Sequence, residues 1–287
     1  MPIAQFDGAL AVVTGAGRGL GRATALALAE RGATVVAADL DRPAAEHTAA
    51  LAAEVGPAAA AYQVDVADAA AMERFADWVR TEHRVPDIVV NNAGILVTGP
   101  FLETGLDDWE RIVGVDLWGV IHGCRLFGRQ MAERVRALPV RPEPPNFGGH
   151  IVNIASAAAF APWREGAAYN TTKAAVVMLS ESLRAELAGL RIGVTAVCPG
   201  FTATGIVRAA TFVGRDEAGR RRARERAEKV LRVRGCPPEK VAEHIVTAIV
   251  KNKPLVPVSA ESHIARVLSR VSPGAMRLLA RVPSPLR

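Results

Sequence analysis

Short β-branched runs alternate with longer Ala- and Leu-rich stretches along most of the chain, and this alternation limits the possible folds more than any other feature. The short runs contain few polar residues, as is typical of strands buried on both faces. Consecutive parallel strands need a crossover connection, which is usually a helix. The pattern therefore predicts an α/β fold with a doubly wound parallel sheet of about seven strands and helices on both faces. The expected strands are residues 9–13, 34–38, 59–64, 87–91, 151–154, 193–197 and 254–258, and the expected helices are residues 19–31, 43–54, 69–83, 107–136, 166–190 and 238–251.

The domain organisation follows from length and from the lack of breaks in the pattern. The chain has 287 residues with no internal repeat and no linker-like segment, so we expect one domain over residues 1–287. Residues 138–147 contain four prolines and predict a stiff loop at the N-terminal edge of the sheet, with a structural or oligomeric role. Residues 201–236 leave the carboxyl end of a strand and are expected to form a substrate lid, and residues 259–287 form a C-terminal extension.

Charge and cysteine content exclude several classes of function. The three cysteines, Cys124, Cys198 and Cys236, lie far apart, which argues against a disulfide framework or a metal site. Of the net charge of +6, an excess of five comes from residues 215–234, with nine basic and four acidic side chains. A single charged segment is usually a solvated helix face, so we do not expect nucleic-acid binding.

Targeting features are also missing from the sequence. It shows no secretory signal pattern and no apolar run near the ~20 residues of a membrane span, so we expect a cytoplasmic protein. The tail at residues 275–286 mixes apolar residues with arginines. We interpret it as an oligomer contact or a surface helix rather than a stable membrane anchor.

A glycine-rich turn, TGAGRGLG at residues 14–21, lies between the first expected strand and the first expected helix. Glycines there allow a tight turn and close approach of the backbone to a pyrophosphate, and the helix N-terminus offers free N–H groups. Asp39 ends the second strand, 24 residues after Gly15, where a carboxylate can accept hydrogen bonds from an adenosine ribose. The alternatives are a tight connection without a ligand and a solvated Asp39.

Two further strand ends carry polar turns where a dinucleotide would run along the top of the sheet. Asp65 and Val66 end the third strand, and NNAG at residues 91–94 ends the fourth. Either segment could instead be an ordinary turn or helix cap, and this alternative is stronger for Asp65.

The most specific signal is Ser156, followed thirteen residues later by Tyr169 and then by Lys173. Tyr169 and Lys173 are four residues apart and share one face of a helix. A free tyrosine has a pKa of ~10, and a nearby ammonium group favours the phenolate and lowers that pKa. Ser156 can hold a substrate oxygen beside the phenol. The trio predicts proton transfer to or from a carbonyl or alcohol.

With these motifs, the chain resembles the short-chain dehydrogenase/reductase family over roughly residues 7–258. The resemblance implies a Rossmann-type fold, an NAD(P) cofactor, and dimers or tetramers formed through the helices near residues 107–136 and 166–190. It also implies that Pro199 and Gly200 shape the nicotinamide pocket, that Thr202 contacts the carboxamide, and that Lys173 binds the ribose. The expected cofactor-binding residues are Gly15, Arg18, Gly19, Leu20, Gly21, Asp39, Asp65, Val66, Asn92, Ala93, Gly94, Tyr169, Lys173, Pro199, Gly200 and Thr202, and the expected catalytic residues are Ser156, Tyr169, Lys173 and Asp116.

Asp116 is a departure from the family pattern, because family members commonly have Asn at this position to hold a water in a proton relay. An ionised Asp accepts hydrogen bonds but cannot donate them. We expect NAD rather than NADP, since Asp39 would repel a ribose phosphate, although Arg18 could attract one. The predicted activity interconverts a secondary alcohol and a ketone on a hydrophobic small molecule, with Tyr169 as the acid/base. The alternative is a catalytically weakened dinucleotide-binding or scaffold protein.

Overall fold

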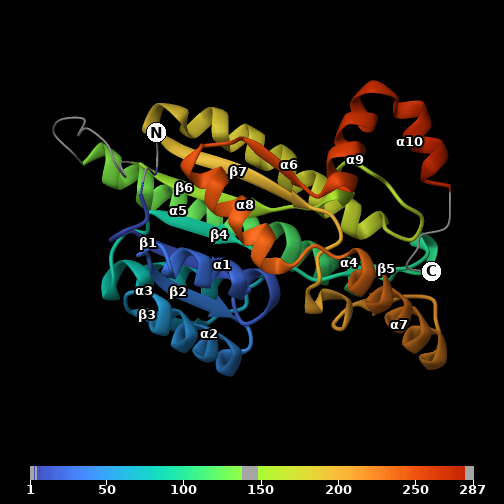
Figure 1. Cartoon of the computed structure of the whole chain (residues 1–287), viewed down its shortest axis with the longest axis horizontal. Helices are drawn as coiled ribbons and strands as arrows, with labels where there is room; N and C mark the ends of the chain where they lie inside the picture. Colours follow the sequence, from blue (N-terminus) through green and yellow to red (C-terminus); the bar gives the residue numbers. More distant parts are fainter. Residues whose placement is uncertain (1–2, 4, 138–147, 282–287) are drawn as a thin grey trace.

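The computed structural model describes residues 3, 5–137 and 148–281, and its centre is a parallel β-sheet (Figure 1). Seven strands of the described chain form it in the order β3-β2-β1-β4-β6-β7-β9, and every neighbouring pair is parallel. This confirms the predicted α/β fold class. The strands are β1 Leu10–Thr14, β2 Thr34–Asp39, β3 Ala59–Gln63, β4 Ile88–Asn91, β6 Gly149–Ile154, β7 Ile192–Pro199 and β9 Leu255–Val258.

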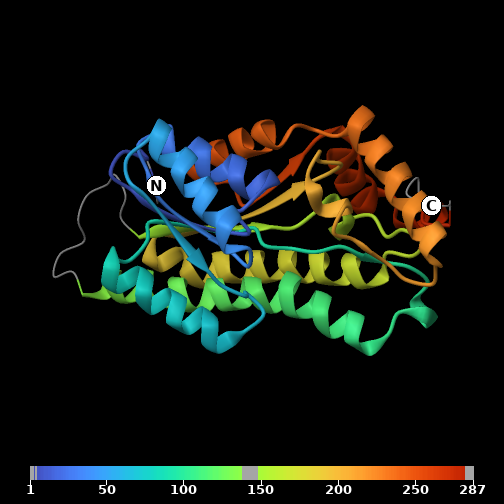
Figure 2. The same ribbon diagram turned by 90° about the horizontal axis from the view of Figure 1, so that it is seen from below.

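Helices cover both faces of the sheet, as the lack of polar alternation in the strands predicts (Figure 2). Successive strand side chains point to opposite faces, so Ala11 and Val13 of β1 join one buried core while Leu10 and Val12 join the other. The first core is closed by α1 Gly19–Ala29, α2 Arg42–Val55 and α8 Pro238–Val250, and the second by α3 Ala69–Glu82, α5 Gly119–Arg136 and α6 Ala167–Leu187.

The helix expected over residues 107–136 is interrupted near its start. Helix α4 Leu106–Val113 passes into a π-helical turn, Gly114–Trp118, before α5 begins. A π-helical turn adds a residue to the helical repeat and often marks a functional position. This turn carries Asp116, whose side chain is fully buried.

The segment after β7 and the C-terminal extension lie at the end of the molecule toward which the sheet strands point (Figure 1). The first contains β8 Thr211–Phe212 and α7 Glu217–Arg234, and β8 pairs with β5 Val97–Thr98 in a small parallel sheet. The extension contains α9 Ala260–Val271 and α10 Pro273–Leu279. None of the described helices combines the length and apolarity needed to cross a bilayer. The Pro-rich segment 138–147 and the end of the tail lie outside the described residues.

Candidate active site

A cavity of about 530 Å³ opens at the carboxyl ends of the strands and gathers residues from distant parts of the chain. Ligands of doubly wound sheets bind at this edge. Every residue expected in the cofactor and catalytic sets lines the cavity except Asp116, which is buried beside it. The lining also contains residues that the motifs did not indicate, among them Ile95, Leu96, Leu231, Glu261 and Ala265.

The glycine-rich turn needs its glycines for space and for backbone conformation. Gly15 has a φ of +62°, and a Cβ there would lie 2.7 Å from the Cα of Ala93. A Cβ on Gly21 would collide with the carbonyl oxygen of Gly15. Helix α1 begins at Gly19, so its unpaired N–H groups face the cavity edge. The glycines therefore keep the backbone of the turn open to a ligand, as a pyrophosphate requires, and the residues present fit a dinucleotide.

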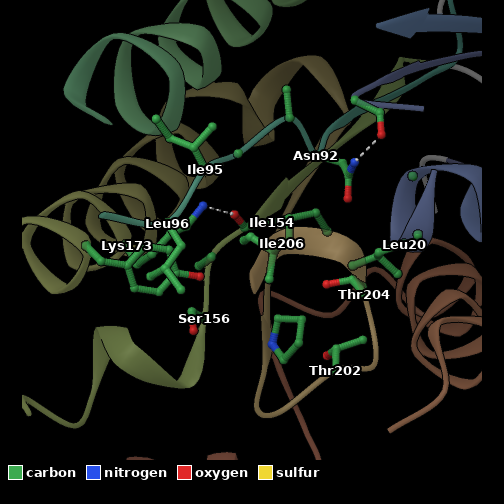
Figure 3. Close-up of a pocket in the computed structure, with 18 of the residues that line it drawn as sticks. Leu20, Asn92, Ile95, Leu96, Ile154, Ser156, Lys173, Thr202, Thr204 and Ile206 are labelled. Atoms are coloured by element: carbon green, nitrogen blue, oxygen red, sulfur yellow. Dashed lines mark hydrogen bonds between the residues drawn. The ribbon is translucent and has the colours of Figure 1, made fainter. Parts of the chain in front are cut away.

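Asn92 and Thr14 join this turn to the end of β4. The Asn92 side chain donates to the carbonyl oxygens of Thr14 and Gly15 over 2.9 and 3.0 Å. The Thr14 hydroxyl accepts from the backbone N–H groups of Asn92 and Ala93 over 3.1 and 3.2 Å. The amide of Asn92 thus stabilises the cradle, while the neighbouring backbone lines the cavity (Figure 3).

Asp39 stands at the end of β2, beside the glycine-rich turn. Its carboxylate accepts a 2.7 Å hydrogen bond from the N–H of Gly17 and a 3.0 Å bond from the N–H of Asp41. These bonds fix the direction of the carboxylate at the cavity wall. Arg18, the competing determinant of cofactor choice, is exposed at the same wall.

Tyr169 and Lys173 lie one turn apart on α6, and Ser156 follows the end of β6. All three residues line the cavity, and Figure 3 shows Ser156 and Lys173 on the same side of it. The Lys173 ammonium lies 5.6 Å from the centre of the Tyr169 ring. Burial raises the pKa of Tyr169 above its ordinary value, and the charge of Asp116 raises it further. The charge of Lys173 lowers that pKa, as the sequence predicts, and a hydrogen bond with Ser156 lowers it as well. Together these two effects do not outweigh burial.

Lys173 forms a buried ion pair with Asp116. Its Nζ lies 3.0 Å from Asp116 Oδ2 and donates to the carbonyl oxygen of Ile154 over 3.2 Å. The other carboxylate oxygen accepts from the N–H of Ile95 over 2.8 Å. Burial lowers the pKa of Lys173, but the charges of Asp116 and Tyr169 outweigh burial and the net pKa is raised. Burial raises the pKa of Asp116 despite the opposing charge of Lys173.

Comparison with known proteins places these features in a family. The family described as short chain dehydrogenase matches residues 9–211. The chain is 44% identical over 283 residues to "Probable oxidoreductase EphD" of Mycobacterium tuberculosis, which covers 98% of this chain and 46% of that protein. The chain therefore spans about half the length of that curated relative.

A shorter relative and a solved structure also match most of the chain. Meso-2,3-butanediol dehydrogenase of Serratia marcescens is 34% identical over 83% of this chain and 86% of its own. A short chain dehydrogenase/reductase from Burkholderia phymatum, solved in complex with NAD, superposes with a TM-score of 0.80 at 30% identity and covers 98% of both chains. The chain belongs to the short-chain dehydrogenase/reductase family.

Proposed function

We propose that this protein is an NAD-dependent oxidoreductase that interconverts a secondary alcohol and a ketone on an apolar small molecule. The observation that carries the proposal is the meeting of Ser156, Tyr169 and Lys173 in one cavity with the glycine-rich cradle. A dinucleotide on that cradle would extend along the strand ends toward the trio. The bound nicotinamide would supply or accept the hydride, and the protein would handle the proton.

Tyr169 is the proposed acid/base. In ketone reduction its hydroxyl gives a proton to the carbonyl oxygen, while Ser156 donates a hydrogen bond to that oxygen. The raised pKa keeps Tyr169 protonated at neutral pH, which suits a proton donor. Alcohol oxidation needs the phenolate instead and should therefore be favoured at alkaline pH. Lys173 would orient the nicotinamide ribose and stabilise the developing phenolate.

The cavity walls favour an apolar substrate body. Beyond the trio, the surrounding side chains are largely aliphatic, including Leu96, Val207 and Leu231, with Trp163 beside Tyr169 at 5.8 Å between ring centres. Relatives include a meso-2,3-butanediol dehydrogenase and a sorbitol dehydrogenase. A polyol would leave several hydroxyls against these aliphatic walls, and burying an unpaired hydroxyl is costly. We therefore favour hydrophobic ketones and alcohols over sugars.

NAD is the proposed nucleotide, because Asp39 is fixed at the cavity wall where it would oppose a ribose phosphate. Relatives of known structure have been solved with NAD, NADH or NADP, so the family alone does not decide the preference. Arg18 is exposed, and solvent weakens its attraction for a phosphate. Assembly as a homodimer or homotetramer through α4, α5 and α6 is proposed on the family resemblance.

A second candidate is a dinucleotide-binding scaffold with weak or no turnover. The observation that favours it is the Asp116–Lys173 ion pair, which offsets the charge that Lys173 directs at Tyr169. A panel of hydrophobic ketones with NADH, followed at 340 nm, separates the two. Sustained NADH oxidation with any ketone supports the enzyme. Tight NADH binding without reduction of any ketone in the panel would favour the scaffold.

A further inference from the structure

The C-terminal extension contributes a side chain to the cavity that no motif indicates. Helix α9 begins at Ala260, and Glu261 and Ala265 on it both line the cavity. Acidic residues are common in the first turn of a helix, where they interact with the helix dipole. Glu261 does more than this, because its carboxylate accepts a 2.9 Å hydrogen bond from the N–H of Phe201.

Phe201 belongs to the turn after β7, residues 199–202, that is expected to shape the nicotinamide pocket. Its N–H is held by Glu261, and its carbonyl oxygen accepts from the N–H of Cys236 over 2.8 Å. Cys236 follows the end of α7, the helix of the expected lid. The backbone of Phe201 therefore joins three parts of the site: the turn, the end of the lid and the C-terminal extension.

Two other bonds hold this region together, one between the turn and the end of β9 and one between the extension and the end of β7. The N–H of Gly200 donates to the carbonyl oxygen of Val258 over 3.2 Å. The buried hydroxyl of Ser262 donates to the carbonyl oxygen of Cys198 over 2.7 Å. The side chains of Glu261 and Ser259 pack against Gly200 so closely that a Cβ there would collide with both. A larger residue at that position would have to displace the Glu261 carboxylate and the Ser259 hydroxyl.

The backbone between β9 and α9 is strained at Ser259. This residue has a φ of +87° and is not a glycine. Such conformations are unfavourable for a residue with a side chain and persist only where the surroundings enforce them. Val258, just before the strained residue, accepts the bond from Gly200. Glu261 and Ser262, just after it, bond to Phe201 and Cys198. The direction in which α9 leaves the sheet is therefore fixed by contacts with the turn.

We propose that Glu261 is a positioning residue that holds the turn at residues 199–202 in the shape that binds the nicotinamide end of the cofactor. The role rests on the proposed function, since it concerns the same cofactor. Helix α9 also contacts the segment Ala157–Ala159, which follows Ser156. One helix of the C-terminal extension thus supports both the cofactor turn and the loop of the catalytic serine.

The test compares binding of NADH to the full chain and to three variants, by cofactor fluorescence without substrate. Glu261→Ala removes the acceptor, and Glu261→Gln keeps an oxygen acceptor without the charge. Glu239→Ala is a matched control, because Glu239 is an exposed first-turn residue of α8 outside the cavity. Thermal unfolding of each protein reports whether the substitution alters stability.

Glu261→Ala should raise the Kd for NADH about tenfold, the loss typical of a hydrogen bond to a charged group. Its Tm should stay within about 2 °C of the wild type, and Glu261→Gln should restore binding to within about threefold. The control should bind as the wild type does. Unchanged binding by Glu261→Ala, or equally weak binding by Glu261→Gln, would overturn the role. A wild type that does not bind NADH would refute the proposed function as well, so the two failures are distinguishable.

Discussion

Replacing Asp116 by Asn removes one negative charge from the buried pair and leaves a side chain of nearly the same size. Asp116 Oδ2 lies 3.0 Å from Lys173 Nζ, which lies 5.6 Å from the centre of the Tyr169 ring. The carboxylate is thus within roughly 9 Å of the centre of the Tyr169 ring, where an effective permittivity of ~20 gives an interaction on the order of 2 kcal/mol between unit charges. This interaction disfavours the phenolate.

The sign of the expected effect follows from the charge that is removed. Asp116 raises the pKa of Tyr169, so Asp116→Asn should lower that pKa and move the rise of alcohol oxidation with pH to lower pH. Part of this decrease in the pKa of Tyr169 is offset, because the loss of Asp116 also lowers the pKa of Lys173 and so reduces the positive charge beside the phenolate. We expect kcat/KM for alcohol oxidation near pH 8 to rise about tenfold, with a smaller effect on ketone reduction near pH 7.

The assay is the pH profile of kcat/KM for oxidation of one alcohol, between pH 6 and pH 10. Asp87→Asn serves as the control, because Asp87 is also a buried carboxylate but pairs with Arg84 and Arg134 and does not line the cavity. The control should lower stability without moving the profile. An Asp116→Asn profile that stays in place or moves to higher pH would refute the reasoning. So would a loss of activity at every pH, which would show that the carboxylate itself is required.

Two further predictions concern cofactor choice and acid stability. Asp39→Ala should lower the ratio of kcat/KM with NAD to that with NADP by about tenfold, and a wild type that already prefers NADP would show that Arg18 outweighs Asp39. His150 is fully buried, its Nε2 lies 2.8 Å from Thr195 Oγ1, and burial lowers its pKa to about 3. The unfolded chain binds a proton at this histidine below pH 6.5 while the folded chain does not, so His150 should cost up to about 1.4 kcal/mol of stability per pH unit between pH 6.5 and pH 3. Chemical denaturation of His150→Gln should show a shallower loss of stability between pH 6.5 and pH 4.5 than the wild type, and an equal loss would contradict this assignment.

The sheet could be predicted because its physics is local. Strands buried on both faces need continuous β-branched runs, so β1, β2 and β4 were visible in the sequence to within a residue or two. The two-residue strands β5 and β8 were not, because two residues carry no periodicity. The π-helical turn at Gly114–Trp118 was also missed, since a single widened turn hardly disturbs the apolar pattern of a long helix.

The site was predictable where a motif has a fixed spacing, as with Tyr169 and Lys173 on one helix face. The partner of Lys173 was not predictable from spacing, because Asp116 reaches it across the fold from another helix. Glu261 lies 60 residues from Phe201 in the chain, and no local pattern marks it. The oligomeric state and the cellular location stay predictions from sequence and family.

The central claim is that Tyr169 transfers the proton, and Tyr169→Phe tests it most directly. The change removes only the hydroxyl and keeps the ring beside Lys173 and Trp163. NADH oxidation at 340 nm with the best ketone should fall at least a thousandfold, a loss at the scale of positioned acid/base catalysis, while the Kd for NADH should stay within about threefold of the wild type. A Tyr169→Phe enzyme that keeps near-normal kcat and binds NADH normally would contradict the account.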